Sequence, residues 1–218
     1  MTVLIVTAVP QEADALRAGL PAGAAVDLHA VGIGPAAAAA GTARLVALAE
    51  GRGRPYALVV NAGIAGGVPG RAAMGATVLG SRSVAAWLGA ETPAGFQPLE
   101  EIGFGAVTRV DAAPGPLAAL AAALPGALVG EILTVTTVTG TAASTAALRA
   151  TYPEMLAEAM EGFGAAVAAA AADLPFVELR TVSNDIGPLD RAAWRLPAAF
   201  AALGAAAPAL AALPAAAR

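Results

Sequence analysis

The chain has 218 residues, of which 58% are apolar, 13% are charged and none is cysteine, and its formal net charge at pH 7 is -4. This negative balance, without an arginine cluster, argues against a nucleic-acid surface, which needs a basic patch to displace counterions. The lack of cysteine excludes disulfide bonds and thiolate metal sites. The length predicts a single domain, residues 1–218, with a sizeable core.

The high apolar content invites a membrane interpretation, but the distribution of the apolar residues argues against it. The first apolar run, residues 2–9, has the length of a strand and follows no basic segment. The apolar C-terminal stretch is interrupted by Pro197, Pro208 and Pro214, and proline breaks or kinks a helix interior. We therefore expect a soluble, cytoplasmic protein with neither a membrane nor a nucleic acid as partner.

The N-terminal part of the chain alternates strands and helices. Residues 2–9 form a nearly continuous apolar and β-branched run, typical of a central strand that is buried on both faces. Pro10 suits the first turn of a helix, which residues 11–20 continue. A short strand at residues 25–31 precedes an alanine-rich helix that ends near residue 50. Strand, helix and strand in this order predict βαβ units and a mainly parallel sheet.

A glycine-rich segment follows the third predicted strand, residues 56–60. Residues 61–67 read Asn-Ala-Gly-Ile-Ala-Gly-Gly, for which we predict a turn. Such a turn leaves backbone N–H groups bare and lets a ligand approach without interference from Cβ atoms. Polar or glycine-rich clusters follow other strands too, at Glu12, residues 32–34 and residues 183–185. Because ligands bind beyond the carboxyl ends of parallel strands, we expect these clusters to form one pocket.

The rest of the chain completes the sheet. We predict strands at residues 76–84, 127–139 and 176–182, a loop at 87–105, and helices at 116–124 and 192–212, the last interrupted at Pro197. Residues 153–173 read as one helix by propensity, but a break near Glu161 would give a strand at 156–160 and a helix from Gly162. The predicted fold is a three-layer αβα domain around a central mixed, twisted β-sheet.

Five short motifs extend over nearly the whole chain. They are Val6-Thr7-Ala8-Val9-Pro10-Gln11-Glu12, Gly32-Ile33-Gly34, the segment 61–67, Ala159-Met160-Glu161-Gly162 and Val182-Ser183-Asn184. In order and spacing they resemble the purine nucleoside phosphorylase and nucleosidase superfamily, and residues 134–142 and 180–194 resemble its futalosine hydrolase subgroup. The resemblance implies a nucleoside phosphorylase-like fold and a homo-oligomer that cleaves the N-glycosidic bond of a small purine nucleoside. We expect no cofactor and no metal.

Cleavage between ribose and a purine passes through a cation-like sugar, so the enzyme must supply a nucleophile, hold the sugar and neutralise the departing base. Glu12 is the candidate for activating water, because a carboxylate can accept the proton of the attacking water. A first-turn glutamate also complements a helix dipole, but the resemblance implies the catalytic role. Phosphorylases instead hold phosphate with arginines. Residues 2–16 and 61–67 contain no arginine, which favours water over phosphate.

Glu161 is the candidate for holding the sugar, because one carboxylate can accept hydrogen bonds from two vicinal hydroxyls. The resemblance places Met160 against the ribose. The alternative for both residues is a position inside a long helix, with the glutamate exposed. We expect further substrate contacts at Gly34, Ala62, Gly63, Ile64, Thr139 and Ser183. A helix-entry turn explains Gly34 equally well, and burial in a strand explains Thr139 at least as well.

Asn184 is the candidate for recognising the base. In the superfamily, nucleosidases for 6-aminopurines carry aspartate at the matching position, whereas enzymes for 6-oxopurines tend to carry asparagine. An amide can donate to N7 and to the 6-oxo group, both acceptors, where an ionised carboxylate cannot. Hypoxanthine fits this pattern. A register shift of one residue would make Asp185 the catalytic acid instead.

The expected reaction is hydrolysis of futalosine to hypoxanthine and dehypoxanthine futalosine, a step of menaquinone biosynthesis. The benzoate end of this substrate needs a cation, and four arginines are candidates: Arg82, Arg180, Arg191 and Arg195. Three alternatives stay open. They are a methylthioadenosine/adenosylhomocysteine nucleosidase with Asp185 facing the base, a purine nucleoside phosphorylase, and a nucleoside-binding protein without activity.

Overall fold

The structure is a computed structural model that describes residues 2–216, with side chains for residues 2–213. Its main sheet contains β1 (Thr2–Thr7), β2 (Val26–Ala30), β3 (Tyr56–Gly67), β4 (Thr77–Ala85), β7 (Arg109–Asp111), β8 (Leu128–Thr134), β9 (Met155–Ala159) and β10 (Phe176–Asp185). The strand order is β10-β4-β8-β9-β3-β1-β2, with β7 paired to β4. Because β3 also pairs with β10, five of the strands close into a ring.

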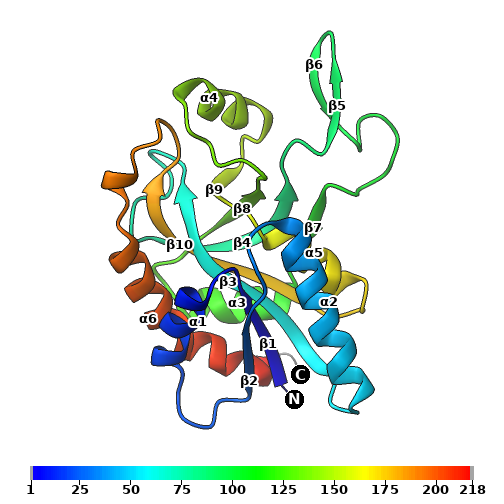
Figure 1. Ribbon diagram of the computed structural model, residues 1–218, viewed down its shortest axis with the longest axis vertical. Coiled ribbons are helices and arrows are strands. Elements are labelled where there is room, and N and C mark those ends of the chain that lie inside the picture. Colours follow the sequence, from blue (N-terminus) through cyan, green and yellow to red (C-terminus); the bar gives the residue numbers. More distant parts are fainter. Residues whose placement is uncertain (1, 217–218) are drawn as a thin grey trace.

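Helices cover both faces of this mixed sheet (Figure 1). The helices α1 (Pro10–Gly19), α3 (Pro114–Ala123) and α6 (Leu196–Ala216) pack together on one face, and α2 (Pro35–Gly51) packs with α5 (Gly162–Ala170) on the other. The helix α4 (Ala142–Thr151) lies near the ends of β3 and β10 (Figure 1). The predicted three-layer α/β fold with a central mixed sheet is therefore confirmed.

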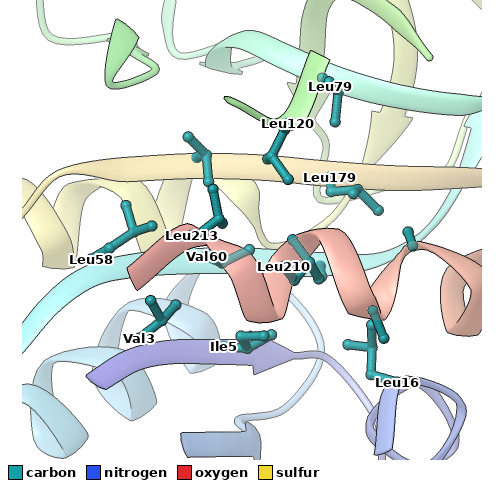
Figure 2. Close-up of a cluster of buried hydrophobic side chains, with 14 of the residues drawn as sticks. Val3, Ile5, Leu16, Leu58, Val60, Leu79, Leu120, Leu179, Leu210 and Leu213 are labelled. Carbon is teal, nitrogen blue, oxygen red and sulfur yellow. The ribbon is translucent and has the colours of Figure 1, made fainter. Parts of the chain in front are cut away.

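The side chains on the two faces of β1 pack into two separate hydrophobic clusters. Val3 and Ile5 belong to the cluster that also contains Leu16 of α1 and residues of α6 (Figure 2). Leu4 and Val6 belong to the cluster under α2 and α5. Successive strand residues point to opposite faces, so a strand between two helical layers needs an unbroken apolar run. The prediction of a doubly buried first strand is confirmed.

The helix α6 is continuous, so the predicted interruption at Pro197 is wrong. Pro197 is the second residue of α6, in the first turn, where the missing N–H has no intrahelical partner to lose. Within residues 2–216, Leu196–Leu213 is the one helical stretch long and apolar enough to cross a membrane, with a mean hydropathy of 1.8. Its buried residues, such as Leu203 and Leu210, belong to the core cluster around β1 and β3. We therefore assign α6 to the core.

The segment 61–67, predicted as a glycine-rich turn, is the second half of β3. It pairs in parallel with β10 as far as Gly67, and Gly66 and Gly67 also pair with β9. The glycines provide close approach rather than a turn, because a Cβ atom on Gly66 would lie 2.7 Å from Cγ2 of Ile186. Two flanking strands thus override the low strand propensity of glycine.

The structure differs from the predictions in further segments. The predicted loop at 87–105 contains a hairpin of β5 (Gly89–Thr92) and β6 (Gly95–Pro98), which projects from the molecule (Figure 1). The strand predicted at 127–139 ends at Thr134, and the helix α4 that follows was not predicted. Its cap is Thr141, whose side chain accepts a hydrogen bond from the backbone N–H of Ser144.

Candidate active site

A cleft of about 350 Å³ lies beyond the ends of β1, β3, β9 and β10. Eight of the eleven predicted site residues line it: Glu12, Ile64, Thr139, Met160, Glu161, Ser183, Asn184 and Asp185. The polar clusters that end separate strands therefore meet in one place, although they are far apart in the sequence.

The other three predicted residues are not among those that line the cleft. Gly34 adopts a φ of 92°, which favours glycine, and its N–H donates to Oε1 of Glu161 at 3.2 Å. Gly63 lies between two charged groups and leaves room for both. A Cβ atom there would lie 2.5 Å from Oε1 of Glu12 and 2.7 Å from Nη1 of Arg180. Ala62 is fully buried in the core cluster and does not line the cleft, so its assignment to the site needs correction.

Glu12 follows β1 in the first turn of α1 and is only 3% exposed. Its Oε2 accepts hydrogen bonds from the N–H groups of Ala8 at 2.8 Å and Val9 at 3.2 Å. Its Oε1 accepts one from Ile64 on β3 at 2.8 Å. Burial raises the pKa of the Glu12 carboxyl above its usual value of 4.5, and Arg180 and the backbone donors partly offset this increase.

Glu161 lies between β9 and α5, so the ambiguous segment is a strand followed by a helix, as the second reading predicted. Its Oε1 accepts from Gly34, and its Oε2 accepts from the N–H of Met160 and from Nη1 of Arg180, each at 3.3 Å. Glu161 is 4% exposed. The break after β9 therefore brings the methionine and the carboxylate to the cleft together.

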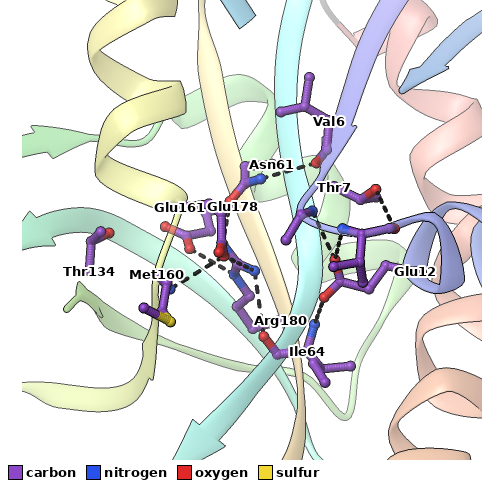
Figure 3. Close-up of polar contacts among 12 residues, drawn as sticks. Val6, Thr7, Glu12, Asn61, Ile64, Thr134, Met160, Glu161, Glu178 and Arg180 are labelled. Carbon is purple, nitrogen blue, oxygen red and sulfur yellow. Dashed lines mark hydrogen bonds and ion pairs between the residues drawn. The ribbon is translucent and has the colours of Figure 1, made fainter. Parts of the chain in front are cut away.

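Arg180 is the buried cation at the centre of this network (Figure 3). Its Nε donates to Glu178 at 2.9 Å, its Nη2 donates to Oδ1 of Asn61, and its Nη1 reaches Glu161 and the carbonyl of Ile64. The sequence analysis missed the roles of Glu178 and Asn61. A signal was present, because a glutamate and an arginine two apart in an apolar strand point to the same face.

The end of β10 contains an irregularity that reorients its side chains. The pairing with β3 shifts between Val182 and Asn184, and such bulges redirect side chains. The hydroxyl of Ser183 donates to Oδ1 of Asn184 at 2.8 Å, and Nδ2 of Asn184 donates to the carbonyl of Asp185 at 3.0 Å. Asn184 and Asp185 both line the cleft, and Asp185 is the more exposed of the two.

Glu158 is a cleft residue that the sequence analysis did not find. Its Oε1 accepts from the N–H of Thr139 at 2.7 Å, and its Oε2 accepts from the Thr139 hydroxyl at 2.5 Å. Burial raises the pKa of the Glu158 carboxyl. Thr139 is therefore held by a buried side chain, rather than by the strand pairing that was predicted for it.

The four arginines considered for the benzoate end occupy different surroundings. Arg180 is enclosed in the buried network, and Arg82 lies at a second cavity, where it pairs with Asp111 and Glu131. Arg191 lies over the ring of Trp194, with its Cζ 5.6 Å from the ring centroid. Trp194 lines the main cleft, whereas neither Arg191 nor Arg195 is among its lining residues.

The exposed residues that line the cleft are mostly apolar. Four large apolar residues at the cleft are well exposed: Ile33, Met74, Val138 and Leu189. The described part of the chain contains no group of three or more His, Cys, Asp or Glu residues placed to hold a metal ion. The site thus combines buried carboxylates with an exposed apolar surface, to which Asp185 and Asp190 add two exposed carboxylates.

Comparison with known proteins gives a consistent result. A family model described as the phosphorylase superfamily matches residues 16–214. Futalosine hydrolase from Streptomyces coelicolor is 50% identical, over 93% of this chain and 92% of its own. Futalosine hydrolase from Acidothermus cellulolyticus is 44% identical, over 93% of this chain and 90% of its own.

Solved structures show the same fold. The 5'-methylthioadenosine/S-adenosylhomocysteine nucleosidase from Colwellia psychrerythraea 34H, in complex with adenine, has a TM-score of 0.80 at 23% identity, and the match covers 97% of this chain and 93% of that one. The corresponding nucleosidase from Neisseria meningitidis, in complex with methylthio-immucillin-A, has a TM-score of 0.77 at 23% identity, with 96% of each chain covered. At this level of identity the likeness shows the fold alone.

Proposed function

The chain belongs to the futalosine hydrolase family within the phosphorylase superfamily, and we propose that it hydrolyses futalosine to hypoxanthine and dehypoxanthine futalosine. The observation that carries this proposal is the shared cleft of Glu12 and Asn184, a buried carboxylate and an amide, in a chain so similar to these hydrolases. We further propose that the reaction is a step of menaquinone biosynthesis in the cytoplasm and that the chain acts as a homo-oligomer.

Glu12 is the proposed base. A carboxylate has about four lone-pair sites, and three backbone N–H groups occupy three of them. The remaining site accepts a hydrogen bond from water and then its proton, as the water oxygen attacks C1′ of the ribose. The C1′–N9 bond breaks, and its electron pair leaves with hypoxanthine, which takes up a proton from water. The raised pKa of Glu12 makes the carboxylate a stronger base than an exposed glutamate.

Glu161 and Met160 are the proposed sugar contacts. The Gly34 N–H, the Met160 N–H and Arg180 fix the Glu161 carboxylate, which accepts hydrogen bonds from the ribose hydroxyls. Met160 lies at the same wall of the cleft and packs against the sugar. A negative carboxylate near the ribose also stabilises the positive charge that develops on the sugar in the transition state.

Asn184 is the proposed contact to the base. Its Oδ1 accepts from Ser183 and one Nδ2 hydrogen is directed to the Asp185 carbonyl, so the second Nδ2 hydrogen is available to N7 or O6 of hypoxanthine. Asp185 is the alternative, and it would suit an adenine-releasing nucleosidase. The amide is favoured because it carries N–H hydrogens to donate to an oxo-purine, whereas a carboxylate carries none.

Arg191 is the proposed contact to the benzoate end. Five carboxylates line the cleft: Glu12, Glu158, Glu161, Asp185 and Asp190. These carboxylates repel a substrate that itself carries a carboxylate, unless a cation lies near the benzoate end of the bound substrate. Arg191 contacts the Trp194 ring at the wall of the cleft, and the exposed Leu189 and Val138 supply apolar surface for the aromatic ring.

Base release from futalosine, inosine and methylthioadenosine, with and without phosphate, tests the proposal. We expect fastest hypoxanthine release from futalosine and no requirement for phosphate. Release only in the presence of phosphate would identify a phosphorylase, and faster adenine release from methylthioadenosine would identify the other nucleosidase. Tight binding of futalosine without any release would identify a nucleoside-binding protein.

A further inference from the structure

Glu178 is a buried carboxylate that the proposed reaction does not use. It is the third residue of β10 and is 1% exposed. Its Oε1 accepts from Nε of Arg180 at 2.9 Å, and its Oε2 accepts from the hydroxyl of Ser83 on β4. An isolated buried charge is costly, so a carboxylate at this place requires the arginine as its partner.

The neighbouring backbone leaves room for this carboxylate. A Cβ atom on Gly162 would overlap both carboxylate oxygens of Glu178, and one on Gly80 would lie 3.3 Å from the Glu178 Cβ. Gly162 is the first residue of α5, directly after Glu161. The same turn that brings Glu161 to the cleft therefore also accommodates Glu178.

The Arg180 guanidinium is held on three sides. Glu178 accepts from Nε, Asn61 accepts from Nη2, and Glu161 accepts from Nη1. A guanidinium is planar, so the bond at Nε fixes the plane in which the two terminal nitrogens lie. Arg180 also acts electrostatically on Glu12. Glu178 thus sets the orientation of a cation that lies between the two cleft carboxylates.

We propose that Glu178 is a positioning residue that fixes the Arg180 guanidinium between Glu12 and Glu161 and offsets part of its positive charge, so that Glu12 keeps its strength as a base. The catalytic part of this inference rests on the proposed function. The part that concerns the charge on Glu12 holds for the protein without substrate.

The charged groups that face each carboxylate determine whether loss of the Glu178 charge raises or lowers the pKa of Glu12. Arg180 and Glu161 face Glu12, and Arg180 lowers the Glu12 pKa while Glu161 raises it. Burial raises the pKa of Glu178, Arg180 and the hydrogen bond from Ser83 act to lower it, and Glu161 adds to the increase. Loss of the negative charge on Glu178 leaves the charge of Arg180 less compensated. The pKa of Glu12 then decreases, and its carboxylate becomes a weaker base.

The test uses the variant Glu178→Gln, which keeps an acceptor for Arg180 but removes the charge. We expect the acid limb of the kcat/KM profile for futalosine to move on the order of one unit toward lower pH, with kcat reduced about tenfold. The matched control is Glu131→Gln on β8, which β4 separates from β10 in the sheet and where Glu131 pairs with Arg82 at 3.5 Å. The control should leave both quantities unchanged.

A second readout does not depend on turnover. The carboxyl carbon of Glu12, followed by NMR during a pH titration, should show a lower pKa in Glu178→Gln than in the unmodified protein. An unchanged Glu12 pKa in the folded variant overturns the inference. If the unmodified protein released no hypoxanthine, the proposed function would fail, and this titration would still decide the inference.

The variant Glu178→Asp covers the case in which Glu178→Gln does not fold. It keeps the charge but shortens the side chain, so the carboxylate no longer reaches Nε of Arg180. We expect about a tenfold loss of kcat with an acid limb close to that of the unmodified protein. Turnover equal to that of the unmodified protein would overturn the positioning role.

Discussion

Gly63 separates the proposed base from the buried arginine, so the substitution Gly63→Ala tests the geometry of the site. The added Cβ would lie 2.5 Å from Oε1 of Glu12, whereas ordinary van der Waals contacts begin near 3.4 Å. The carboxylate oxygen must therefore retreat by about 0.9 Å, the difference between these distances. Such a shift lengthens its hydrogen bond to the Ile64 N–H, now 2.8 Å.

A displacement of about 1 Å in a reacting group costs roughly 100-fold in rate. We expect kcat for futalosine to fall about 100-fold in Gly63→Ala, with a smaller change in KM, and the free energy of unfolding to fall by about 1–3 kcal/mol through overpacking. Steady-state kinetics and thermal unfolding measure both effects. The control is Gly51→Ala, at the end of α2, where a Cβ meets nothing within 4 Å. A folded Gly63→Ala protein with unchanged kcat would refute the reasoning.

Three further predictions concern the base, the benzoate and the pH dependence. Asn184→Asp should lower kcat/KM for futalosine by about 100-fold or more, because a carboxylate cannot donate to the oxo-base; an unchanged value would remove Asn184 from base recognition. Arg191→Ala should raise KM for futalosine about tenfold and leave KM for inosine, which lacks the benzoate, unchanged. In the control Arg195→Ala both KM values should stay the same, and an equal effect of the two substitutions would argue against Arg191. Burial raises the pKa of Glu12 and only its ionised form accepts a proton, so kcat/KM measured from pH 4 to 8 should rise with pH through a midpoint above 4.5; a midpoint at or below that value would contradict Glu12 as the base.

The fold could be predicted from the sequence wherever a local pattern of apolar residues determines the element that forms. The unbroken apolar run of β1 reflects burial between two helical layers. The segment 61–67 was predicted wrongly, because pairing with β9 and β10 decides its conformation and those strands lie about 90 to 120 residues further along the chain. Local propensity cannot report such partners.

The main residues of the candidate site could be predicted from the sequence, but the buried residues that hold them in place could not. Glu12 and Glu161 follow strands and Asn184 lies near the end of β10, and strand ends of one sheet meet at one edge. Glu158 and Glu178 lie in apolar segments; the fold reveals Thr139 as the partner of Glu158, while the i, i+2 spacing of Glu178 and Arg180 is visible in the sequence. A charge within a buried strand is the signal that would have led to both, since such a group requires a partner.

The most direct test of the account is the rate of hypoxanthine release from futalosine in phosphate-free buffer by the unmodified protein and by Glu12→Gln. Futalosine binding to both is measured by calorimetry. The account predicts release by the unmodified protein, a loss of about 1,000-fold in kcat on substitution, and binding that changes only a few-fold. Equal rates for the two proteins, or release that requires phosphate, would contradict it.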